Sequence, residues 1–129
     1  MHCKMTHQMI RVFDLDRSIQ FYKDALGMHE TRRKDVPKGK FTLVYLGDGE
    51  SDFELELTYN YNPASPYTLG NGYGHLAVYV DDLEKAHEEH QAKGYCVGPL
   101  KGLSDDGKKN YYFLTDPDGY QIEVMRRPQ

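Results

Sequence analysis

The chain lacks several features that would assign a protein to a class at once. Its 129 residues include no tryptophan and only two cysteines, Cys3 and Cys96. Two cysteines are too few for a disulfide framework, so we expect free thiols in the reducing cytosol, with Cys96 as a small core residue. No apolar run approaches the ~20 residues that cross a bilayer, and the N-terminus lacks the apolar segment of a signal peptide. A cytoplasmic protein with no membrane partner is expected.

Basic stretches are also scarce. The net charge is −4, and the short lysine pairs at residues 38–40 and 108–109 resemble solvated loops. Without a basic stripe to neutralise phosphates, nucleic acid is not the expected partner. The length suits one domain, and a hydrophobic content of 39% without glycine is compatible with a folded core.

What the chain does contain is an internal repeat. Residues 7–17 align with residues 75–85, and each copy begins with a histidine, His7 or His75. Each half also closes on an apolar segment that carries glutamate, at residues 53–58 and 120–125. Two copies of roughly 60 residues would each be marginal alone, so we expect them to share a single core over residues 1–129. Module one spans about residues 4–60, the linker about 61–71 and module two about 72–127.

The periodicity predicts the same order of elements in both halves. A strand at 6–12 precedes a helix capped by Asp14 and ended by Gly27, with strands at 28–32, 41–46 and 53–59. In the second half a strand at 74–80 precedes a helix that begins with a capping box of Asp81 and Glu84 and stops at Gly94. Strands at 95–97, 111–115 and 120–125 follow, the last two joined by a tight turn at 116–119. The fold class is therefore α+β.

Strand alternation places four possible metal ligands on matching faces. Side chains two apart share a face of a strand, so aliphatic residues take one face and the polar residues the other. The polar face of each half holds one histidine and one glutamate at repeat-equivalent positions: His7, Glu56, His75 and Glu123. Glu54 shares the face of Glu56, but its repeat counterpart is Gln121, which favours Glu56. Two imidazoles and two carboxylates suit ions such as Zn, Ni, Co, Mn or Fe(II). His87 and His90 are expected to be structural, on a wet or half-buried side of their helix.

Several motifs together carry a resemblance to a known family. They are residues 7–12, the FYxxxLGM segment at 21–28, LELTYN at 55–60, GYGHLA at 72–77 and DPDGYQIE at 116–123. Through them the chain resembles glyoxalase I, the lactoylglutathione lyases of the vicinal oxygen chelate superfamily. The resemblance implies paired βαβββ modules that form a cupped, largely antiparallel eight-stranded sheet. It also implies that His7, Glu56, His75 and Glu123 bind one divalent metal, with Ni or Co favoured over Zn because the chain is short.

The resemblance further implies the substrate, which is the hemithioacetal of glutathione and methylglyoxal. Arg11, Asn60 and Lys108 are the expected glutathione contacts, whereas Asn71 stands where Zn-type relatives carry an arginine. Proton abstraction next to the carbonyl would give an enediolate, with Glu123 as base and Glu56 as ligand and partner, although pseudosymmetry allows these roles to exchange. A homodimer is expected, with the site built within one chain or across two. An epimerase, an extradiol dioxygenase and a metal-free binder of the bleomycin-resistance type are the alternatives.

Overall fold

The computed structural model describes residues 1–102 and 105–129. These residues form two compact units, Met1–Thr68 and Leu69–Gln129, and each repeats the order strand, helix, strand, strand, strand. The predicted α+β class and the two βαβββ modules are thus confirmed, and the eight strands form two four-stranded mixed sheets. The single shared domain stays a prediction.

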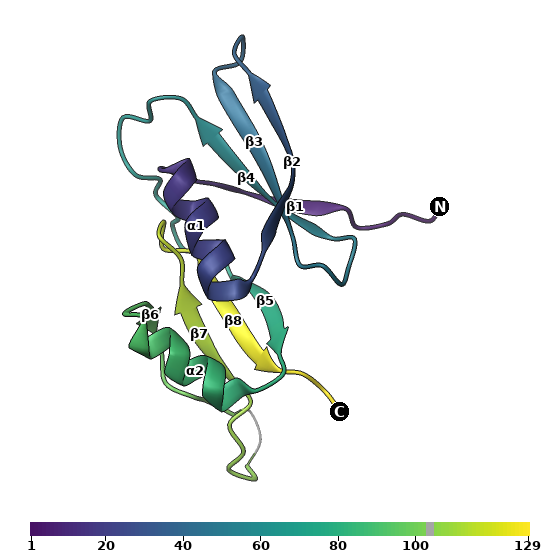
Figure 1. The fold of residues 1–129 in the computed structure, drawn as a ribbon, viewed down its shortest axis with the longest axis vertical. Coiled ribbons are helices and arrows are strands. Elements are labelled where there is room, and N and C mark those ends of the chain that lie inside the picture. The colour runs from purple at the N-terminus through teal and green to yellow at the C-terminus, as the bar shows by residue number, and fades with distance from the viewer. Residues whose placement is uncertain (103–104) are drawn as a thin grey trace. The chain divides into compact units, whose positions relative to one another are not determined.

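The first unit runs β1 (His7–Arg11), α1 (Leu15–Leu26), β2 (His29–Val36), β3 (Phe41–Gly47) and β4 (Glu54–Asn60). Its sheet has the order β1-β4-β3-β2, in which β1 and β4 are parallel and the other pairs are antiparallel (Figure 1). The strand order leaves β1 at an edge of its sheet, next to the strand that carries Glu56.

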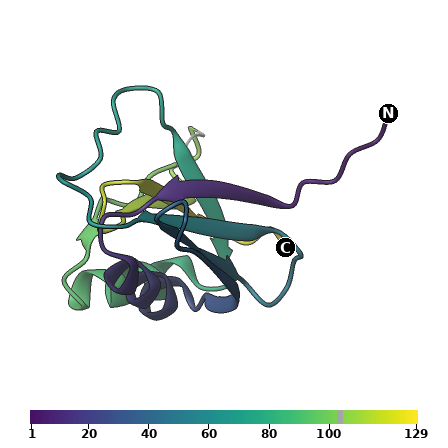
Figure 2. The same cartoon turned by 90° about the horizontal axis from the view of Figure 1, so that it is seen from above.

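The second unit runs β5 (His75–Val80), α2 (Leu83–Ala92), β6 (Cys96–Val97), β7 (Tyr111–Thr115) and β8 (Gln121–Arg126). Its sheet has the matching order β5-β8-β7-β6, again with one parallel pair, β5 and β8. In each unit the helix covers one face of its own sheet, as Figure 2 shows. The faces away from the helices are the ones that hold the histidines.

Helix α1 begins and ends where the sequence predicts. The Asp14 side chain accepts a hydrogen bond of 3.1 Å from the backbone N–H of Arg17, which satisfies a free donor of the first turn. Gly27 ends the helix at φ 66°, a left-handed conformation that glycine adopts without strain. Phe21 and Tyr22 of this helix are buried. Ile10 of β1 and Val12, which follows β1, are buried as well, and all four belong to the core.

Helix α2 differs from the prediction in its cap and in its buried face. The cap is Asp82, which accepts 3.1 Å from the backbone N–H of Lys85, so the proposed box of Asp81 and Glu84 is wrong. The Glu84 carboxylate instead pairs with Arg126 at 2.5 Å. His87 and His90, expected on a wet or half-buried side, are both buried. The glutamate three residues on favoured Asp81 in the sequence, but either aspartate can cap a helix, and the backbone conformation selects Asp82.

Two further expectations concern the surface. Cys96 was expected in the core, but the short strand β6 lies at an edge and leaves this thiol exposed. Cys3 is exposed as well, and both cysteines are free, as predicted. Over the described ranges 1–102 and 105–129, none of the helices has the length and apolar character that spanning a membrane requires.

Candidate metal centre

The first half-site lies on β1 and β4. Nε2 of His7 is 3.3 Å from Oε1 of Glu56. In the parallel register His7 is opposite Glu54, and Met9 is opposite Glu56, so the carboxylate reaches back along the strand to the ring. The imidazole is 37% exposed and the carboxylate side chain 10%, so the pair opens to solvent on the histidine side.

The second half-site repeats this geometry on β5 and β8. Nε2 of His75 is 3.4 Å from Oε1 of Glu123, with side-chain exposures of 41% and 16%. The register is also the same, because His75 is opposite Gln121 and Ala77 is opposite Glu123. The repeat predicted from the sequence therefore extends to the register and to the pairing of side chains within each module.

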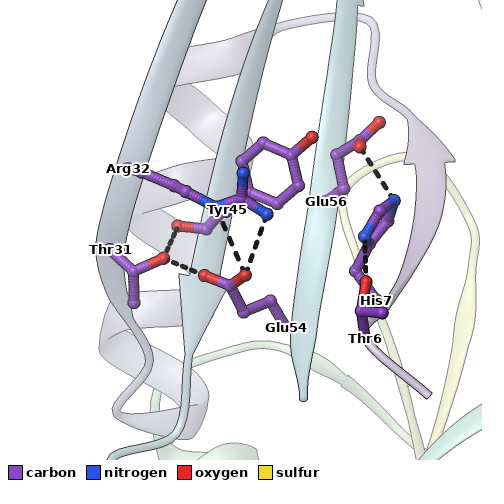
Figure 3. A network of polar contacts seen from close by, with 7 residues as sticks. All are labelled: Thr6, His7, Thr31, Arg32, Tyr45, Glu54 and Glu56. Atoms are coloured by element: carbon purple, nitrogen blue, oxygen red, sulfur yellow. Dashed lines mark hydrogen bonds and ion pairs between the residues drawn. The ribbon is translucent and has the colours of Figure 1, made fainter. Parts of the chain in front are cut away.

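The choice of Glu56 over Glu54 has a structural basis (Figure 3). The Glu54 carboxylate accepts a short hydrogen bond from the Thr31 hydroxyl and pairs with the Arg32 guanidinium at 3.1 Å. The hydrogen bond from the Thr31 hydroxyl lowers the pKa of Glu54, and the Arg32 guanidinium lowers it further. The Glu54 carboxylate is thus already bonded within its own module. Glu56 instead faces His7.

Groups that sequence reasoning did not single out surround the first pair. The Thr58 hydroxyl donates to Oε2 of Glu56 at 2.9 Å, and the Thr6 hydroxyl lies 2.7 Å from Nδ1 of His7. Tyr45 is the cross-strand neighbour of Glu56, and the interaction of its hydroxyl with that carboxylate, followed by burial, raises the pKa of Tyr45. The sequence gives little indication that these residues are neighbours of the pair. To find them, one would need the β3–β4 register and the single-residue differences between the two halves.

The predicted glutathione contacts lie on different elements. Arg11 is the last residue of β1 and is opposite Thr58 of β4. Asn60 ends β4, where its amide donates 3.0 Å to the Tyr67 hydroxyl. Lys108 follows a turn in the second unit, where its backbone N–H donates 2.9 Å to Asp106. The structure does not test their role in binding a substrate, which stays a prediction, as do the metal roles of the four ligands.

The donor chemistry of the two half-sites fits a divalent metal. Each supplies one imidazole nitrogen and one carboxylate, and two such pairs match the mixed nitrogen and oxygen ligands of Ni, Co, Zn or Fe(II) centres. Among the residues that the structure describes, no three His, Cys, Asp or Glu side chains gather into a ready-made cluster. Each half-site thus has two side chains that could bind a metal, one imidazole and one carboxylate.

Comparison with known proteins places these half-sites in a family context. Residues 4–124 match the family model of the Glyoxalase/Bleomycin resistance protein/Dioxygenase superfamily. A lactoylglutathione lyase of Haemophilus influenzae is 47% identical over 95% of this chain and 91% of its own length. A probable chloroplastic lactoylglutathione lyase of Arabidopsis thaliana is 44% identical over 96% of this chain, which spans only 36% of that relative.

The solved structures agree with the sequence relatives. The trypanothione-dependent glyoxalase I of Leishmania major superposes with a TM-score of 0.81 at 41% identity, covering 97% of this chain and 87% of its own. Similarity at this level extends over both modules and both half-sites.

Proposed function

The chain belongs to the Glyoxalase/Bleomycin resistance protein/Dioxygenase superfamily, and from this premise we propose that it is a metal-dependent lactoylglutathione lyase. The reaction would convert the hemithioacetal of glutathione and methylglyoxal into S-D-lactoylglutathione through an enediolate, which detoxifies methylglyoxal. The observation that carries the proposal is the repeated His–Glu pair, with the same strand register in both modules. Near-full-length identity to the Haemophilus influenzae lyase supports it.

We propose that His7, Glu56, His75 and Glu123 together hold one divalent ion, with Ni or Co favoured over Zn. When bound, such an ion would supply Lewis acidity that stabilises negative charge on the substrate oxygens. The Glu123 carboxylate would take the proton from the carbon beside the carbonyl and return a proton to the neighbouring carbon. Glu56 would act chiefly as a ligand. Arg11, Asn60 and Lys108 would hold the peptide part of glutathione, where a guanidinium suits a carboxylate.

A homodimer is part of the proposal, with each site built from module one of one copy and module two of the other. Both histidines lie on edge strands, β1 and β5. On the same strands Met9 and Tyr79 are 36% and 52% exposed, and an edge strand with exposed apolar side chains can pair with another chain. A second chain would cover these edges. The location in the reducing cytosol, expected from the cysteines, stays a prediction.

The test is an ultraviolet assay of thioester formation from methylglyoxal and a thiol. Metal is removed by dialysis against a chelator, and Ni²⁺, Co²⁺ or Zn²⁺ is added back, with glutathione and trypanothione as alternative thiols. We expect turnover with glutathione that Ni²⁺ or Co²⁺ restores better than Zn²⁺. Full activity with Zn²⁺ alone would overturn the metal preference. Purified protein that binds no stoichiometric metal and forms no thioester would favour a binding protein over the lyase.

A further inference from the structure

The two half-sites differ in the side chains that support them. Around His7 and Glu56 the supporting groups are hydroxyls, whereas the repeat-equivalent positions of module two have none. Thr6 corresponds to Gly74, Tyr45 to Phe113 and Thr58 to Met125. The aromatic rings keep the same place, since Tyr45 is edge-on to His7 at 5.4 Å between centroids and Phe113 is edge-on to His75 at 5.3 Å. The modules therefore share a framework and differ in hydrogen-bonding groups.

Tyr45 is a buried member of the first half-site. Its ring is 8% exposed, and the Arg32 guanidinium carbon lies 3.6 Å from the ring centroid. Arg32 is in turn tied to Glu54, which the Thr31 hydroxyl also contacts. In Figure 3 the ring lies between Arg32 and the Glu56–His7 pair, with its hydroxyl directed toward Glu56. The phenol is thus fixed by Arg32 on one side and faces the Glu56 carboxylate on the other.

The support of Glu56 continues on its other oxygen. The Thr58 hydroxyl donates 2.9 Å to Oε2, while His7 faces Oε1 at 3.3 Å. The Thr6 hydroxyl can accept the Nδ1–H hydrogen of His7, which leaves Nε2 with a lone pair for a metal. Glu123 has a histidine neighbour of the same kind, but its flanking Phe113 and Met125 cannot donate a hydrogen bond. Its carboxylate therefore lacks the hydroxyl support that Thr58 gives to Glu56.

We propose that Tyr45 is a positioning residue that fixes the Glu56 carboxylate as a metal ligand, so that the less constrained Glu123 is left to move the proton. This inference rests on the proposed lyase function and adds to it the reason why two pseudosymmetric carboxylates take different roles. A carboxylate that accepts a hydrogen bond from Thr58 and faces the Tyr45 hydroxyl is held in one geometry, which favours metal binding, whereas proton transfer to and from two carbons requires a carboxylate that can move.

The test uses two opposite single-oxygen changes in the full chain. Tyr45→Phe removes the hydroxyl from module one, and Phe113→Tyr places one at the equivalent position of module two. Tyr61→Phe is the matched control, because it removes a part-buried tyrosine hydroxyl of the same unit whose hydrogen-bond partner is Thr42. The Kd for Ni²⁺ is measured by isothermal titration calorimetry, and kcat and KM are measured at saturating Ni²⁺. Circular dichroism checks that each variant is folded.

We expect Tyr45→Phe to weaken Ni²⁺ binding by about tenfold, the lower end of the usual effect of groups that orient ligands, while Tyr61→Phe leaves the Kd unchanged. Phe113→Tyr should lower kcat at saturating Ni²⁺ with little change in KM. An unaltered Ni²⁺ affinity in Tyr45→Phe, or an unaltered kcat in Phe113→Tyr, would overturn the inference. Should Tyr45→Phe misfold, Thr58→Val removes the second hydroxyl and must weaken Ni²⁺ binding for the inference to stand.

The outcomes separate this inference from the proposed function. Wild-type protein that binds Ni²⁺ and loses affinity in Tyr45→Phe, but that forms no thioester, would refute the lyase and support the positioning of Glu56. Wild-type protein that forms thioester, with a Kd that Tyr45→Phe does not change, would refute the positioning role and support the lyase.

Discussion

At the scale of single residues, the two acidic side chains of module one show how the environment distinguishes chemically identical groups. Glu54 and Glu56 lie on the same strand and the same face, yet the first is occupied by Thr31 and Arg32 while the second faces an imidazole. In module two the position equivalent to Glu54 is Gln121, which donates 2.9 Å to Thr115. Each module therefore has one carboxylate beside its histidine, and the proposed chemistry divides between these two.

Glu123→Gln tests the base directly. The amide keeps the size of the side chain but cannot accept the proton, so we expect kcat to fall by about 10²- to 10⁴-fold at saturating Ni²⁺ while the fold is retained. The measurement is the thioester assay, together with circular dichroism. Glu84→Gln makes the same chemical change at an exposed carboxylate that pairs with Arg126, and it should turn over normally. Near-normal turnover by Glu123→Gln would refute its role as base.

At the scale of elements, α2 is attached to its sheet by polar contacts rather than by aliphatic packing alone. Nε2 of His87 donates to the carbonyl of Gly98 at 2.8 Å, and Nδ1 of His90 is 2.7 Å from the hydroxyl of Tyr112, which is fully buried. These rings also lie edge-on to Tyr112, at 4.7 and 5.9 Å between centroids. The helix thus packs on β7 through an aromatic cluster that depends on satisfied hydrogen bonds.

Tyr112→Phe should lower the free energy of unfolding and make that free energy depend less on pH above neutrality. Loss of the hydroxyl removes a buried bond to His90, and we expect about 1–3 kcal/mol less stability in urea unfolding at neutral pH. Burial raises the pKa of Tyr112, so its contribution is full below the unfolded value of about 10 and is lost as the pH rises toward the folded value. Between neutrality and about pH 10.5 the wild type should therefore lose more stability than Tyr112→Phe.

The cap of α2 gives a second test at this scale. Asp82→Ala removes the acceptor for the Lys85 N–H and should cost about 1 kcal/mol in urea unfolding. Asp81→Ala should cost much less, because Asp81 is an exposed partner of Arg127. Equal losses in the two variants, or a larger loss for Asp81→Ala, would contradict the assignment of Asp82 as the cap.

The sequence predicts elements and faces better than it predicts neighbours. Period-two alternation put Glu54 and Glu56 on the face of His7, and the internal repeat, in which Gln121 is the counterpart of Glu54, favoured Glu56 as the neighbour of His7. It could not identify Tyr45 as a neighbour of Glu56, since that contact depends on cross-strand register and on a rotamer. The burial of His90 was not predicted for a related reason. A helical histidine is expected at the surface unless a buried hydrogen-bond partner is known, and here that partner is Tyr112.

At the scale of the whole molecule, the repeat explains why one chain has two incomplete sites. Each module carries one His–Glu pair, and the metal site that we propose needs both pairs. The edge positions of β1 and β5, with exposed Met9 and Tyr79, support a second copy as the complement. Sequence patterns within one module contain no information on this step, because it depends on how separate surfaces meet.

Complementation between two inactive variants tests how the modules combine. His7→Ala disables module one and His75→Ala disables module two, so each homodimer should lose stoichiometric Ni²⁺ and turnover. If each site joins module one of one copy to module two of the other, a mixed dimer has one site with both histidines lost and one intact. After subunit exchange of equal amounts, half the dimers are mixed, and we expect about a quarter of wild-type turnover. Mixing either variant with itself is the control. No recovery, with mixed dimers demonstrated by mass spectrometry, would place both half-sites of each centre in the same chain.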